Sequence, residues 1–170
     1  MKPRRTEEEA MLKRMEQIAR EATDEDRRKV EEIVRRAPGS AHDCAIITFT
    51  PGMGAILFLH HNTHNRTWKL AKIREYQRRI NLGDWKFNSN GAGFFTTGAI
   101  SDMQHRLAAH VLCDMPWEVT VTFEVDPDAA DTMDFGDPRG GDDAADIKYG
   151  TTESKPKLAI VRAAYSYYRH

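Results

Sequence analysis

Residues Gly91–Cys113 read GAGFFTTGAISDMQHRLAAHVLC, and this stretch decides the fold. Its first part alternates loosely between apolar and small residues around Thr97-Gly98, which predicts a β-hairpin. From Arg106 onward the apolar residues return at helical spacing, so we expect the polar cluster Asp102–Arg106 on the first turn of a helix. The sequence thus predicts a strand, a tight polar turn and a helix N-terminus in direct succession.

The polar cluster contains the side chains needed to bind an anion. The first N–H groups of a helix have no partners inside the helix, and the helix dipole places positive potential there. His105 and Arg106 add donors, and a guanidinium matches the oxygens of a phosphate in pairs. Asp102 is expected either to cap the helix or to hold Mg²⁺ beside a phosphate. A polar turn that only caps the helix is the alternative interpretation of so short a motif.

The flanking segments predict an α+β fold with a small mixed sheet and helices around it. Trp117–Val125 places an apolar residue at every second position, which is typical of a half-buried strand. The other expected elements are a strand over Cys44–Phe49 and helices over 50–59, 68–82 and 157–168. Gly83 is expected to end the helix over 68–82.

The N-terminal segment is highly charged, with sparse apolar residues at helical spacing. Thr6 with Glu9 suggests a capping box, and Thr23 before Asp-Glu-Asp marks a second N-cap, so two helices are expected. We interpret the segment as a solvated helical arm, and a dimer or DNA contact is the alternative. The predicted division of the chain is a charged arm over 1–39, a core over 40–150 and an amphipathic helix over 151–170.

The composition limits the partners. The 170 residues include 25 Lys and Arg and 26 Asp and Glu, for a net charge of -1, so a nucleic-acid contact requires a local basic patch. Cys44 and Cys113 form no CxxC pair, which suits a reducing cytosol. Because no apolar run approaches a membrane-spanning length, we expect a cytoplasmic chain without a membrane partner.

Four blocks of sequence resemble a family of phage and actinobacterial ParB-like proteins in the ParB/sulfiredoxin superfamily. The blocks are NTHNR at 62–66, GDWKFN at 83–88, ISDMQHRLAA at 100–109 and DTMDFG at 131–136. The blocks of the family read roughly NTHNR, GxWxFNG, LLDGQHRLAA and DTxDTG. The likeness spans about residues 46–150, and four blocks in order are more specific than any one of them.

The resemblance implies a ParB/sulfiredoxin-like fold that binds ATP or CTP, in the cytoplasm of a bacterial host cell. The implied nucleotide-binding residues are Thr63, His64, Asn65 and Arg66 on one side of a cleft and Asp102, Met103, Gln104, His105 and Arg106 on the other. The catalytic candidates are Asp102, Gln104 and His105, and the candidate Mg²⁺ ligands are Asp102 and Asp134. Gln104 stands where the superfamily has Glu or Cys, so neither sulfinic-acid reduction nor a carboxylate general base is expected. Met103 stands at the position of a glycine.

Three functions remain open at this point. The first is a nucleotide-binding domain that acts on or near DNA, with NTP hydrolysis or phosphoryl transfer undecided. The second is a non-catalytic phage or plasmid DNA-binding or adaptor protein, and a homodimer is compatible with either. The third is a metal-dependent nuclease using Asp102 and Asp134.

The best candidates for a DNA contact are three arginines on one helix face, Arg74, Arg78 and Arg79. His60, His61 and His64 are expected to be loop residues rather than a metal site.

Overall fold

A computed structural model describes residues 3–39, 43–63, 65, 67–87 and 90–127, all within one compact unit, Met1–Asp131. The elements in this part of the chain are α1 (Pro3–Glu21), α2 (Asp24–Arg36), β1 (Cys44–Phe49), α3 (Pro51–His60), α4 (Leu70–Asn81), β2 (Ala92–Phe95), α5 (Gln104–Leu112) and β3 (Trp117–Val125). The predicted α+β class is confirmed, with a three-stranded mixed sheet. The expected helix over 157–168 lies outside the described residues.

Strand β3 is the centre of the sheet, whose order is β1-β3-β2. It runs antiparallel to β1, with Phe49 opposite Trp117, and parallel to β2, with Ala92 opposite Val121. The predicted alternation holds, because Trp117, Val119, Val121 and Phe123 are buried while Glu118 and Thr122 are exposed. One face of the sheet therefore forms part of the core.

The hairpin predicted between 91 and 101 is only partly present. Gly98 adopts a φ of 80° in the turn, and a single antiparallel bridge joins Phe94 to Ile100. The N–H of Phe95 donates to the carbonyl of Ala99 at 2.8 Å, and that of Ser101 donates to the carbonyl of Gly93 at 2.9 Å. The N–H of Ile100 donates instead to the carbonyl oxygen of His61 at 2.8 Å. Strand β2 also pairs with β3 on its other side, a long-range contact that the local pattern does not encode.

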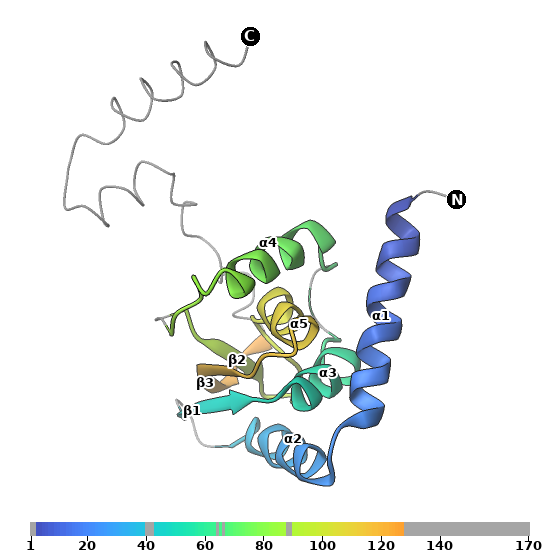
Figure 1. Cartoon of the computed structure of the whole chain (residues 1–170). Coiled ribbons are helices and arrows are strands. Elements are labelled where there is room, and N and C mark those ends of the chain that lie inside the picture. Colours follow the sequence, from blue (N-terminus) through green and yellow to red (C-terminus); the bar gives the residue numbers. More distant parts are fainter. Residues whose placement is uncertain (1–2, 40–42, 64, 66, 88–89, 128–170) are drawn as a thin grey trace, which may run out of the picture. The chain divides into compact units, whose positions relative to one another are not determined.

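Helix α3 is the central helix and packs against α1, α2 and α5 (Figure 1). Thr50 caps it by accepting the N–H of Met53 at 3.1 Å, and Pro51 occupies its first turn, as predicted. Gly54 allows the close approach of α5, because a Cβ there would lie 2.6 Å from a methyl group of Val111. The helix is apolar on nearly every side because neighbours surround it.

The N-terminal arm packs onto the core through its sparse apolar residues. The residues it buries include Met11, Met15, Ile18, Val30 and Ile33. The prediction that Thr6 caps the first helix is wrong, because α1 already begins at Pro3 and Thr6 lies inside it. The second predicted cap is confirmed, with Thr23 and Asp26 forming a reciprocal capping box.

Gly83 terminates α4 as predicted, because it follows the C-cap residue Leu82 and has a φ of 71°. The N–H of Gly83 donates to the carbonyl of Ile80, and that of Asp84 donates to the carbonyl of Arg79, which is a Schellman motif. None of the helices in the described ranges is both long and apolar enough to cross a membrane.

Candidate functional site

Helix α5 begins at Gln104, so the polar cluster lies at its N-terminus as predicted. Met103 is the N-cap residue, with a φ of −173° and no side-chain hydrogen bond to the cap. A φ of this kind does not require glycine, so the Cβ of Met103 is accommodated without backbone strain. The Met103 side chain is buried in the hydrophobic core, while Asp102 before it is exposed.

The first and third sequence blocks meet at this helix start. The Asn62 side-chain amide donates to Gln104 Oε1 at 3.2 Å. Asn65 Nδ2 donates to Asn62 Oδ1 and to the carbonyl oxygen of Ile100, both at 2.7 Å. The backbone N–H of Lys69 donates to His105 Nε2 at 2.9 Å. The loop after α3 and the start of α5 thus form one polar network, which we call the loop–helix network.

Two of the predicted catalytic side chains, those of Gln104 and His105, accept hydrogen bonds within this network. Gln104 is 4 % exposed, and its side-chain oxygen accepts from Asn62. His105 accepts a hydrogen bond on Nε2, which places the proton of its neutral ring on Nδ1. The lone pair that a general base would need is therefore engaged by the backbone of Lys69.

Arg106 points inward, with only 9 % of its surface exposed. Its guanidinium donates to the carbonyl oxygens of Asn90 and Gly91, the latter at 2.7 Å. It also donates to the carbonyl and carboxylate oxygens of Asp102, at 3.2 and 3.3 Å. It lies over the ring of Trp117, 5.4 Å from the centroid. Arg106 therefore joins the polar turn to the segment before β2.

Asp102 does not cap the helix, because its carboxylate pairs with Arg106 instead. The other predicted ligand residues divide into three groups. Thr63 is exposed, Asn65 is half-buried, and His64, Arg66 and Asp134 lie outside the described residues. Over the residues that the structure describes, no group of three or more His, Cys, Asp and Glu side chains is placed to hold a metal ion.

A buried histidine lies beneath the site and is absent from the sequence prediction. The His110 ring stacks on Trp117 at 5.4 Å and meets Trp85 edge-on at 5.1 Å. Burial lowers its pKa to about 4, while the nearby backbone of Met115 acts in the opposite direction. The sequence signal was its helical spacing from Arg106, four residues earlier, which places both side chains on one face.

The basic face of α4 is partly neutralised. Arg74 pairs with Glu7 of α1 at 3.0 Å, and Arg79 pairs with Glu75 at 3.6 Å. Arg78 is exposed and makes no ion pair with any described residue. Of the three arginines predicted to contact DNA, Arg78 is thus the one without an acidic partner in this part of the chain.

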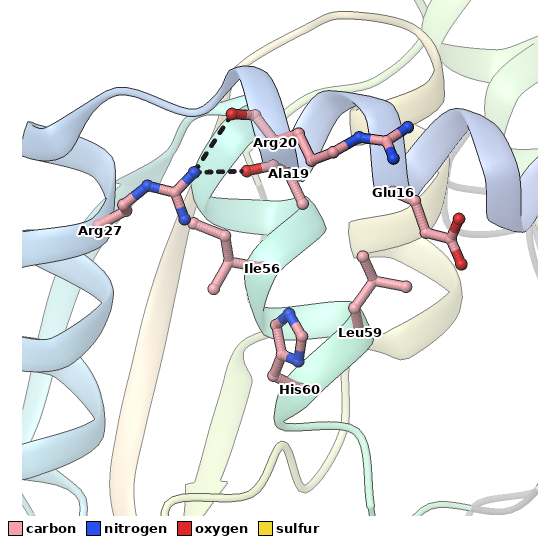
Figure 2. Close-up of a pocket in the computed structure, with 7 residues that line it drawn as sticks. All are labelled: Glu16, Ala19, Arg20, Arg27, Ile56, Leu59 and His60. Atoms are coloured by element: carbon pink, nitrogen blue, oxygen red, sulfur yellow. Dashed lines mark hydrogen bonds between the residues drawn. The ribbon is translucent and has the colours of Figure 1, made fainter.

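The structure also contains a groove that the sequence did not indicate. It lies between α1, α2 and α3, with a volume of about 320 Å³ (Figure 2). Its lining residues are Glu16, Ala19, Arg20, Arg27, Ile56, Leu59 and His60. They come from three helices whose packing is not readable from local patterns, which is why sequence reasoning missed the groove.

Comparisons of the chain with family models, with curated proteins and with solved structures gave no match. The resemblance to ParB-like proteins accordingly rests on the four sequence blocks. The structure describes most of the first three blocks, and the fourth lies outside the described residues.

Proposed function

We propose that this chain is a ParB-like nucleotide-binding domain that holds ATP or CTP at the start of α5 and acts on or near DNA. The observation that carries the proposal is the loop–helix network, which brings the Asn62–Arg66 and Ile100–Ala109 blocks together through direct hydrogen bonds. The positive end of the helix dipole lies at the start of α5 and favours a bound phosphate there. The exposed carboxylate of Asp102 lies in the turn directly before it.

The roles of the side chains favour binding over turnover. Gln104 is neutral and accepts from Asn62, and His105 accepts from the backbone of Lys69. Asp102 is exposed and oriented by Arg106, so it is the group best placed to hold Mg²⁺ against a phosphate. We therefore propose Asp102 and His105 as the ligand contacts in the described part of the chain, and Arg106 as the residue that positions Asp102.

Thermal unfolding with ATP, CTP, GTP and ADP, each with and without Mg²⁺, tests the proposal. A nucleotide at about 100 times its Kd adds roughly 2.7 kcal/mol to the free energy of unfolding, which raises Tm by several degrees. Asp102→Asn and His105→Ala are expected to reduce this increase. The exposed residues Asp84 and His60 provide matched controls in Asp84→Asn and His60→Ala. A folded protein whose Tm responds to none of the four nucleotides would rule the proposal out.

A DNA contact through α4 is the second part of the proposal. It is supported by Arg78, which is exposed and has no acidic partner among the described residues. Binding to duplex DNA is expected to weaken with rising salt, and Arg78→Gln is expected to lower the affinity and the salt slope by about one charge. Arg74→Gln is the matched control, because Arg74 already pairs with Glu7. Equal affinities for the two variants would exclude this surface.

A further inference from the structure

The groove between α1, α2 and α3 has an aliphatic floor and a charged rim. Ala19 is buried, and Ile56 and Leu59 are half-buried at its base. The rim consists of Glu16 and Arg20 of α1, Arg27 of α2 and His60 of α3. A concave site of about 320 Å³ with an apolar floor and a few converging polar groups has the dimensions of a small-ligand pocket.

Arg27 is fixed at the edge of the groove before any ligand arrives. Its Nη2 atom donates to the carbonyl oxygen of Ala19 at 3.0 Å and to that of Arg20 at 3.3 Å. These carbonyls belong to the last turn of α1, where the helix has no partners of its own. Figure 2 shows the other terminal nitrogen, Nη1, directed toward Ile56. Within the described residues, Nη1 and Nε of Arg27 have no hydrogen-bond acceptor.

The groove also has an excess of unpaired positive charge. Neither Arg20 nor Arg27 forms an ion pair with a described residue, and Glu16 is the one acidic side chain in the lining. The neighbouring Arg28 shows the contrast, because it lies between Glu25 and Glu32 on the outer side of α2. Arg27 also offsets the negative end of the α1 dipole, so the carbonyls there do not repel an anion as strongly.

We propose that this groove binds a small organic anion with an aliphatic body, such as a short-chain carboxylate. The carboxylate accepts from Nη1 of Arg27, and the chain lies on Ile56 and Leu59. In Figure 2 the ring of His60 faces the same space from below and closes it on the side opposite Arg20. The groove shares no residue with the start of α5, so this inference stands independently of the proposed nucleotide site.

Titration of the ¹⁵N-labelled chain with hexanoate, followed by NMR, tests the inference. Saturable shifts are expected for the Arg27 side-chain Nε–H and for the backbone amides of Ile56, Leu59 and His60. Hexanol has an aliphatic chain of similar length without the charge, and hexylamine has such a chain with the opposite charge. Acetate has the carboxylate but only a methyl group in place of the chain. Each is expected to bind about ten-fold or more weakly than hexanoate. If hexanol or hexylamine binds as tightly as hexanoate, the assignment of an anion site is wrong.

Arg27→Gln and Arg28→Gln form the matched pair of variants. Arg27→Gln is expected to weaken hexanoate about ten-fold, and Arg28→Gln, one residue away but outside the groove, is expected to leave it unchanged. Because Arg27 also caps α1, circular dichroism must show that the variant is folded. Leu59→Asn replaces an apolar side chain of the groove with a polar one and leaves Arg27 in place, and it is also expected to weaken the binding of hexanoate. Unchanged affinity in both Arg27→Gln and Leu59→Asn would overturn the proposal.

Discussion

At the scale of single residues, Arg106 has a different role from the one its motif suggests. Sequence reasoning predicts a guanidinium that grips a phosphate, and the structure directs it inward onto backbone carbonyls and Asp102. Burying an arginine is unfavourable unless its donors are satisfied. Here the carbonyl oxygens of Asn90 and Gly91 and both acceptor groups of Asp102 meet that need.

Arg106→Lys is therefore expected to destabilise the fold. An ammonium keeps the charge but does not reproduce the planar fork that reaches two carbonyls and Asp102 together. We expect the free energy of unfolding, measured with urea, to fall by about 2 kcal/mol. Arg78→Lys, at an exposed arginine, is expected to change it by less than about 0.5 kcal/mol. An Arg106→Lys protein of unaltered stability that has lost nucleotide binding would reassign Arg106 as a ligand contact.

His110 predicts a pH dependence of stability. Its pKa is about 4 in the folded chain and 6.5 in the unfolded one, so between these values the unfolded state binds more protons. The contribution of the neutral His110 to the free energy of unfolding is complete above pH 6.5 and decreases as the pH falls toward 4. Allowing for partial solvent screening, we expect a loss of roughly 2 kcal/mol between pH 7 and pH 4. Urea unfolding of the protein and of His110→Phe is measured at several pH values, and the difference between the two proteins gives the contribution of His110. Burial also lowers the pKa of His61, but His61 is present in both proteins and its effect cancels.

At the scale of elements, Asp26 joins the arm to the core. Burial raises its pKa, but hydrogen bonds from the side chains of Thr50 and Thr23 and from the Thr23 backbone outweigh this, so the net pKa is lowered. Thr50 Oγ1 donates to Asp26 at 2.6 Å while also capping α3. One carboxylate thus takes part in the N-terminal caps of both α2 and α3.

Replacing Asp26 is expected to loosen both helix starts at once. Asp26→Asn exchanges one acceptor oxygen for a donor, and we expect the free energy of unfolding to fall by about 1–2 kcal/mol. Asp24→Asn is the control, because Asp24 is also in the first turn of α2 but does not contact Thr50. A double-mutant cycle with Thr50→Val measures the coupling. Additive effects in that cycle would show that the Asp26–Thr50 hydrogen bond contributes no stability.

Local sequence patterns predicted most of the helices and strands correctly. They did not predict the features that depend on contacts between residues distant in sequence. The alternation in Trp117–Val125 and the Thr50-Pro51 and Gly83 signals give the observed elements because each depends on neighbours in sequence. The pairing of β2 with β3 joins strands that are distant in sequence, and the inward Arg106 depends on the carbonyls before β2. At the site, the resemblance predicted the first and third blocks on opposite sides of a cleft, and the direct hydrogen bonds between them were not predicted. The groove beside Arg27 depends on the packing of three helices.

At the scale of the whole molecule, the central position of β3 governs how the described part is assembled. Both β1 and β2 pair with β3, the last strand along the described chain. The sheet contacts are thus made between residues far apart in sequence, which slows their formation. As the polypeptide leaves the ribosome, α1 to α5 emerge before the strand that completes the sheet. Until Trp117–Thr122 has been synthesised, β1 has no strand to pair with, and Phe49 lacks the Trp117 ring that it contacts in the folded chain.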